Sequence, residues 1–119
     1  MDDIRKYSIV IVTFNNAEGL KRTLESVKSL HYENKETIVI DGGSTDNSLQ
    51  VISVYQDMID TKVSEKDTGI YNAMNKGVKL LTGDYVVFMN AGDVFANEDV
   101  LSTVNKYPGD IILGSDTYG

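Results

Sequence analysis

The chain has 119 residues, enough for one domain with a single hydrophobic core, and 18 acidic against 11 basic residues give it a formal net charge of −7. The basic residues are scattered, which argues against a nucleic-acid-binding protein, and the absence of cysteine excludes disulfides and thiolate metal sites. No apolar run approaches the roughly 20 residues of a membrane-spanning helix, and the acidic N-terminus lacks the basic region of a signal peptide. A cytoplasmic location is therefore expected.

The first half of the chain contains two pairs of a strand and a helix. Residues 8–14 read SIVIVTF, a pattern typical of a central parallel strand that is buried on both faces. Apolar residues at helical spacing follow between residues 15 and 30 and predict an amphipathic helix. The second pair is a buried strand over residues 36–41 and a helix over residues 45–57, in which Leu49 is expected to face inward.

The second half repeats this alternation. A weaker strand over 61–64 precedes a helix over 70–81 and a strand over 85–89, and a shorter helix over 97–106 leads to a last strand over 110–114. This order predicts an α/β fold, with a Rossmann-like, mostly parallel sheet flanked by helices, in a single domain over residues 1–119. Ligands of such open sheets bind at the carboxyl ends of the strands, so the loops that follow the strands are the candidate sites.

The loop after the second predicted strand begins with Asp41. A carboxylate only accepts hydrogen bonds, which suits a ligand with an imide N–H or a ribose hydroxyl, but Asp-Gly is also a common turn dipeptide. Both interpretations stay open from the residues alone. The following GGSTD looks like a phosphate cradle, yet we favour a bend at the glycines with Ser44, Thr45 or Asp46 capping the next helix.

The sharpest motif is NAGD, which follows the apolar run of the fourth predicted strand. Asn90 and Asp93 offer oxygen ligands beside small residues, a set that suits Mg²⁺ or Mn²⁺ shared with phosphate. A diphosphate beside Asp41, Asp67 and Asp93, in a protein of net charge −7, also requires a cation. An Asx-turn or a helix cap is the alternative.

The first loop, TFNN, carries no nucleotide fingerprint of the common kinds. It contains neither a Gly-x-Gly-x-x-Gly nor a P-loop sequence. A dinucleotide-dependent dehydrogenase and a P-loop enzyme are therefore not expected.

Three segments together resemble the N-terminal half of a family 2 glycosyltransferase with the GT-A fold: SIVIVTFNNAEGLKRTLESV, IVIDGGSTDNS and SEKDTGIYNAMNKGVKLLTGDYVVFMNAGD. The resemblance covers most of the chain, in the right order and spacing. It implies the inverting transfer of a sugar from a nucleotide-sugar donor, usually a UDP-sugar, with Mg²⁺ or Mn²⁺. The acceptor would be a saccharide or a lipid-linked molecule in cell-surface polysaccharide synthesis.

The resemblance also implies roles for residues at matching positions. Thr13, Phe14 and Asn15 would line the base pocket, and Asp41 would accept the uracil N3–H. The further nucleotide contacts would come from the later loops, namely Asp67, Gly69, Asn90 and Asp93. Because NAGD occupies the place of the family's Asp-x-Asp metal motif, the implied metal ligands are Asp93 and, more weakly, Asn90.

Two departures from the family pattern bear on activity. Many members have carboxylates at the positions of Asn90 and Gly92, whereas this chain has only Asp93. Members are also generally more than twice as long, and the general base and the acceptor site are expected beyond residue 119. A non-catalytic nucleotide-sugar-binding module is thus one alternative, and a structural domain without nucleotide affinity is another. Peripheral membrane association of the intact enzyme and self-association through the last strand are further expectations.

Overall fold

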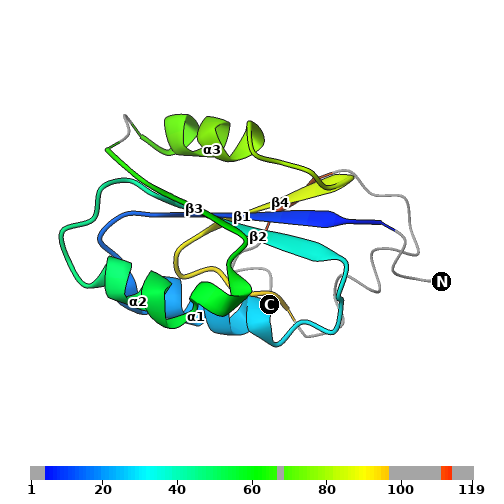
Figure 1. Cartoon of the computed structure of the whole chain (residues 1–119), viewed down its shortest axis with the longest axis horizontal. Coiled ribbons are helices and arrows are strands. Elements are labelled where there is room, and N and C mark those ends of the chain that lie inside the picture. Colours follow the sequence, from blue (N-terminus) through cyan, green and yellow to red (C-terminus); the bar gives the residue numbers. More distant parts are fainter. Residues whose placement is uncertain (1–4, 67–68, 97–110, 114–119) are drawn as a thin grey trace.

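The computed structural model describes residues 5–66, 69–96 and 111–113, and these form one sheet between two layers of helices (Figure 1). The strand order is β3-β2-β1-β4-β5, and every neighbouring pair is parallel, as the alternation of elements predicts. The strands are β1 (Tyr7–Thr13), β2 (Lys35–Asp41), β3 (Thr61–Ser64), β4 (Tyr85–Asn90) and β5 (Ile111–Leu113). The carboxyl ends of β1, β2 and β4 gather on the left in Figure 1.

The helices cover both faces of the sheet. One face carries α1 (Ala17–Lys28) and α2 (Ser48–Val54), and α2 is followed by a short 3₁₀ helix, η2 (Gln56–Met58). The opposite face carries α3 (Ile70–Val78) (Figure 1). No helix among the described residues is long and apolar enough to cross a membrane.

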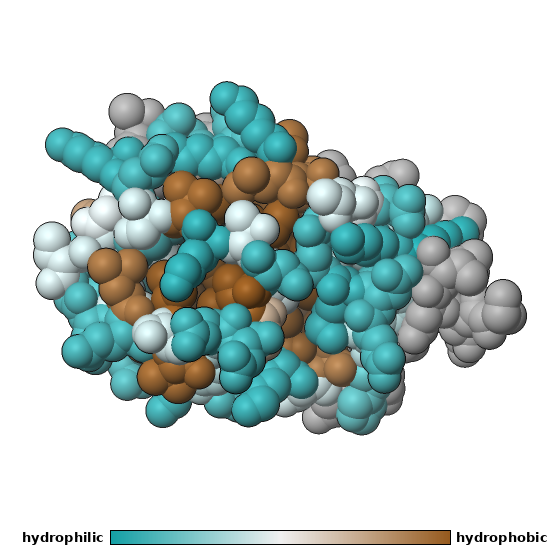
Figure 2. Space-filling view, in the orientation of Figure 1, coloured by the Kyte–Doolittle hydropathy of each residue, from teal (hydrophilic) through white to brown (hydrophobic). Residues whose placement is uncertain are grey.

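The central strand β1 is buried at every position, so its side chains fill two cores. Ile9 and Ile11 point toward α1, where Leu24 joins them, whereas Val10 and Val12 point toward α3. This alternation is the period of two that a strand imposes on its side chains. Apolar side chains are visible in the middle of the face in Figure 2, between mostly polar side chains above and below. The prediction of a central strand buried on both faces is confirmed.

The second helix begins later than predicted. The N–H groups of Thr45 and Asp46 donate to the side-chain oxygen of Asn15, at 2.7 and 3.3 Å, so the turn before α2 is held by β1's loop rather than by helical hydrogen bonds. The helix starts at Ser48 as a result, and Ser48 and Ile52 are its buried residues. Leu49 is 47% exposed, so the prediction that it faces inward was wrong.

Two other predicted elements also end early. The strand β1 stops at Thr13, and Phe14 lies beyond it with 60% of its surface exposed. The helix α3 ends at Val78, which is 47% exposed, rather than at Leu81. Leu81 follows the helix and packs, half-buried, against the core on the α3 side of the sheet. The helix predicted over residues 97–106 lies outside the described residues.

Candidate functional site

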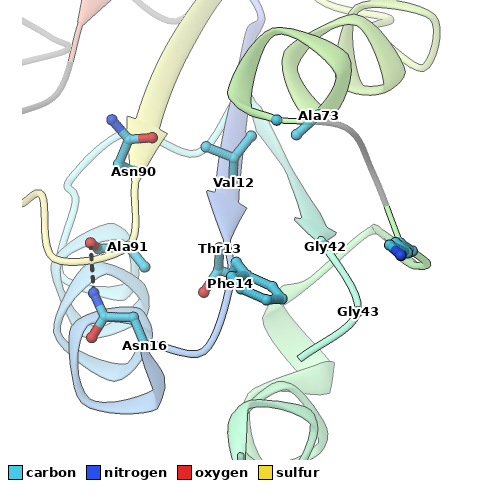
Figure 3. Close-up of a pocket in the computed structure, with 11 residues that line it drawn as sticks. Val12, Thr13, Phe14, Asn16, Gly42, Gly43, Ala73, Asn90 and Ala91 are labelled. Carbon is cyan, nitrogen blue, oxygen red and sulfur yellow. Dashed lines mark hydrogen bonds between the residues drawn. The ribbon is translucent and has the colours of Figure 1, made fainter. Parts of the chain in front are cut away.

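A pocket of about 720 Å³ opens at the carboxyl ends of β1, β2 and β4, beside the first turns of α3 (Figure 3). This is the edge of the sheet at which the sequence predicts ligand binding. The end of β1 lies in the middle of the pocket, with Gly42 and Gly43 on one side and Asn90 and Ala91 on the other (Figure 3). The full lining is Val12, Thr13, Phe14, Asn16, Gly42, Gly43, Lys66, Gly69, Ala73, Asn90 and Ala91.

Thr13 lines this pocket and carries an unpaired polar atom. Its side chain is 5% exposed, and its hydroxyl is the only buried side-chain polar atom within the described residues that has no hydrogen-bond partner. An unsatisfied buried hydroxyl costs about 1–3 kcal/mol of stability, so native structures rarely keep one without a use. A ligand that exchanges a hydrogen bond with Thr13 would satisfy it.

The two residues after Thr13 differ in placement. The ring of Phe14 lies along the pocket and is largely exposed, which leaves a flat apolar surface against which a planar ligand ring can stack (Figure 3). Asn15 is not part of the lining: it adopts a positive φ of 48°, and its N–H donates to the Ser44 hydroxyl at 2.8 Å. Asn15 therefore shapes the pocket wall instead of facing the cavity.

Asp41 is fully buried and lies at the end of β2, behind the pocket lining. Its Oδ2 accepts the N–H groups of Gly43 at 3.1 Å and Ser44 at 2.9 Å, together with the hydroxyl of Ser64 at 2.9 Å. The hydroxyl of Ser44 donates to Oδ1. The turn interpretation of Asp41 is thus realised in the structure. These four hydrogen bonds equal the number that a carboxylate accepts, with three at Oδ2 and one at Oδ1.

Asp46 joins the N-termini of two helices. Its carboxylate accepts the N–H of Ala17, the first residue of α1, at 3.2 Å and the N–H of Ser48, the first residue of α2, at 2.9 Å. The Ser48 hydroxyl also donates to it, and these hydrogen bonds hold the pKa of Asp46 below its usual value. The N-cap position of α2 is Asn47, whose side chain makes no cap hydrogen bond, so the prediction of Ser44, Thr45 or Asp46 as the N-cap was wrong. Asp46 holds the start of α2 from one residue earlier.

The motif Asn90-Ala91-Gly92-Asp93 forms a tight turn at the end of β4. The N–H of Asp93 donates to the carbonyl of Asn90 at 2.9 Å, and Gly92 has a φ of +107°, a value that a side chain at this turn position would strain. In return, Oδ2 of Asp93 accepts the N–H of Asn90 at 2.8 Å. Asn90 lines the pocket, whereas Asp93 lies just outside the lining.

The donor set at this turn fits one kind of metal site. The described residues contain no cluster of three or more His, Cys, Asp or Glu side chains that could hold a metal alone. Mg²⁺ and Mn²⁺, however, are commonly held by one or two protein oxygens while phosphate oxygens and waters complete the shell. The carboxylate of Asp93 and the amide oxygen of Asn90 fit a metal that is shared with a diphosphate.

The sequence does not single out Lys66 as a pocket residue, yet it is among the residues that line the cavity. Its neighbour Glu65 is paired with Lys76 at 3.1 Å, and no carboxylate of the described residues pairs with Lys66. Gly69, at the N-terminus of α3, also lines the pocket, and Asp67 lies outside the described residues. The position of Lys66 beside Asp67, in the loop after β3, is the signal that could have identified it.

Comparison with known proteins identifies a family to which the sequence is similar. Residues 8–115 match the family model described as Glycosyl transferase family 2. An uncharacterized glycosyltransferase of Mycobacterium tuberculosis (strain H37Rv) is 38% identical over 96 residues, which cover 80% of this chain and 37% of that relative.

Solved structures give the same fold. A mannosyltransferase from Pyrobaculum calidifontis, in complex with GDP-Man and Mn²⁺, has a TM-score of 0.79 and 24% identity over 87% of this chain and 32% of its own. TarS 1-349 from S. aureus, in complex with UDP-GlcNAc, has a TM-score of 0.77 and 23% identity over 85% of this chain and 30% of its own. The predicted α/β fold of GT-A type is confirmed. The chain spans about a third of the length of these three proteins.

Proposed function

The chain belongs to glycosyl transferase family 2. On that premise we propose that it forms the donor-binding part of an enzyme that transfers a sugar from a nucleotide-diphosphate donor. The nucleotide that we propose is UDP. The observation that carries this proposal is the pocket at the end of β1. The buried hydroxyl of Thr13 lacks a hydrogen-bond partner there. The turn over residues 90–93, which offers oxygen ligands for a metal and is called the metal-competent turn below, forms the opposite wall. A nucleoside diphosphate matches both sides of this pocket: its planar base fits the side near Phe14, and its charged diphosphate fits the side near the metal-competent turn.

The base and ribose are assigned to the half of the pocket near β2. Phe14 stacks on the base, and the Thr13 hydroxyl exchanges a hydrogen bond with it. Asp41 accepts the imide N–H at Oδ1, which accepts only the Ser44 hydroxyl in the structure. This requires the turn over residues 42–44 to shift, since Asp41 is fully covered and already accepts four hydrogen bonds. Asp67 and Gly69 contact the uridine from the loop before α3, and Asn15 acts indirectly by holding the turn over residues 44–46.

The diphosphate is assigned to the half near β4. Asp93 and Asn90 hold Mg²⁺ or Mn²⁺, which when bound supplies the positive charge that a diphosphate requires beside carboxylates. The mannosyltransferase complex contains Mn²⁺ together with GDP-Man, which supports the use of a divalent cation beside the donor. The ammonium group of Lys66 adds a second positive charge at the pocket.

The reaction of the whole enzyme is an inverting displacement. The acceptor hydroxyl oxygen forms a bond to the anomeric carbon, the bond from that carbon to the phosphate oxygen breaks, and its electron pair leaves with the diphosphate. The hydroxyl proton passes to a general base that lies outside the residues assigned above. The acceptor is a saccharide or a lipid-linked molecule of cell-surface polysaccharide synthesis.

Calorimetric titration of UDP into the chain, with and without Mn²⁺, tests the donor site. GDP is the comparison, because one similar structure contains GDP-Man and another contains UDP-GlcNAc. We expect Mn²⁺-dependent binding that prefers UDP. Tighter binding of GDP would change the assigned base, and no binding of either nucleotide to folded protein would contradict the proposal.

A further inference from the structure

The metal-competent turn is fixed in place by a side chain of α1. Thr23 lies in the middle of α1 and is fully buried. Its hydroxyl donates to the carbonyl oxygen of Asp93 at 2.7 Å and accepts the N–H of Gly92 at 2.9 Å. The carbonyl oxygen of Asn90 also lies 3.5 Å from this hydroxyl. A hydroxyl has only one proton to donate, so the shorter bond to Asp93 takes it, and all three contacts tie the turn to α1.

The position of this turn determines where the Asp93 carboxylate lies. Oδ2 of Asp93 is held by the N–H of Asn90 at 2.8 Å, whereas Oδ1 accepts no hydrogen bond from the residues that the structure describes. One oxygen thus orients the carboxylate and the other is available to a cation. Any movement of the backbone at Gly92 and Asp93 would move both oxygens together.

A second anchor of α1 acts on the other half of the turn. Asn16 caps α1 by accepting the N–H of Gly19 at 3.1 Å, and its amide nitrogen donates to the carbonyl of Ala91 at 3.1 Å (Figure 3). Asn16 lines the pocket, however, so changing it would also alter the cavity. Thr23 is not among the lining residues, which makes it the cleaner position at which to test the anchoring.

We propose that Thr23 is a positioning residue for the metal: it sets the place of the Asp93 carboxylate without itself touching metal or nucleotide. This inference rests on the proposed function of Asp93 as a metal ligand. Groups that orient a ligand in this way typically change metal affinity by roughly 10- to 100-fold when they are removed.

The test compares Thr23→Val, which keeps the shape of the side chain but removes the hydroxyl, with Thr23→Ser, which keeps the hydroxyl. Mn²⁺ affinity is measured by electron paramagnetic resonance in the presence of UDP. The affinity for uridine, which carries no diphosphate, is measured by calorimetry without metal. We expect Thr23→Val to weaken Mn²⁺ binding at least about tenfold and to leave uridine binding unchanged. Thr23→Ser is expected to restore most of the Mn²⁺ affinity.

Ser26→Ala is the matched control. Ser26 also lies on α1, and its hydroxyl accepts the N–H of Phe95 at 2.7 Å, two residues beyond the turn. This variant is expected to lose a comparable hydrogen bond while keeping wild-type Mn²⁺ affinity. Should Thr23→Val fail to fold, Thr23→Ala is measured against Thr23→Ser in the same way.

The outcomes separate the two proposals. Wild-type Mn²⁺ affinity in folded Thr23→Val, or an equal loss of uridine binding, would overturn the positioning role and leave the donor site standing. A wild-type chain that binds UDP with no dependence on Mn²⁺ would overturn the metal assignment of Asp93 and the role of Thr23 with it.

Discussion

Strand β2 carries a buried carboxylate near each of its ends, and the two carboxylates have different surroundings. Glu36, near the amino end, is 7% exposed, and Asp41, at the carboxyl end, is fully buried. Both accept several hydrogen bonds from the protein. Burial and hydrogen bonding alone therefore do not distinguish a structural carboxylate from one beside a ligand site.

The amino end of the sheet is a closed polar network. Oε2 of Glu36 accepts the hydroxyl of Ser8 and the N–H of Thr82, and Ser8 in turn accepts the N–H of Gly83 at 2.9 Å. Burial raises the pKa of Glu36, but these hydrogen bonds and the nearby Lys6 ammonium outweigh burial and hold the pKa below its usual value. The network joins β1, β2 and the turn before β4.

The carboxyl end is satisfied less completely. The hydrogen bonds of Asp41 stay within its own turn and the end of β3, and the neighbouring Thr13 hydroxyl is left without a partner beside the pocket. An unpaired polar atom next to a cavity indicates a binding function, whereas a closed network indicates a stabilising one. We therefore expect substitutions at the two ends to separate binding from stability.

The largest effect is expected for Asp93→Ala. The variant removes the only carboxylate of the NAGD turn, so Mn²⁺-dependent UDP affinity should fall by more than the roughly 10- to 100-fold that indirect metal contacts account for. Calorimetry with Mn²⁺ measures this loss, and urea unfolding should show a stability close to wild type. Unchanged Mn²⁺-dependent binding would mean that the metal is held elsewhere.

Glu36→Gln should have the opposite effects to Asp93→Ala: it should lower the stability of the protein and leave UDP affinity unchanged. The oxygen of a glutamine amide can accept both hydrogen bonds, but it is uncharged and accepts them more weakly than a carboxylate does. Its N–H₂ group also replaces Oε1 in a buried site, so we expect a loss of about 1–3 kcal/mol in the free energy of unfolding. UDP affinity should not change. Urea unfolding and calorimetry on the same preparation check both statements, and a loss of UDP affinity in the folded variant would argue against the separation of the two ends.

The stability that Glu36 contributes should depend on pH in a defined direction. Its pKa is lower in the folded protein than in the unfolded chain, so the contribution is fully present above the unfolded value of about 4.3 and is lost as the pH falls through the lowered folded value. The difference in unfolding free energy between wild type and Glu36→Gln should therefore shrink in acid. A difference that stays constant from neutral pH to below that range would contradict the assignment.

Thr13→Val should weaken UDP binding less than Asp93→Ala does, and it should not lower the stability of the protein. The hydroxyl has no partner to lose within the described residues, so the variant should be at least as stable as wild type. Loss of one ligand hydrogen bond should weaken UDP binding by about 3- to 10-fold. A variant that binds UDP as wild type does would remove Thr13 from the site.

The parts of this fold that depend on local patterns could be predicted from the sequence. β-Branched runs gave the strands, and the parallel order placed the candidate loops at one edge of the sheet. The late start of α2 could not be predicted, because it depends on a hydrogen bond from Thr45 to Asn15, 30 residues away. The anchoring by Thr23 was missed for the same reason: in the sequence it is an ordinary helix residue, and its role appears only when β4 lies beside α1.

The most direct measurement is a titration of the isotope-labelled chain with UDP and Mg²⁺, followed by amide chemical shifts in nuclear magnetic resonance spectra. We expect the shifts to concentrate at the carboxyl end, at Thr13, Gly42, Gly69 and Asn90, with little change at Ser8, Glu36 and Gly83. Shifts confined to the amino end, or none at the pocket at a saturating concentration of UDP, would contradict the assignment of the donor site.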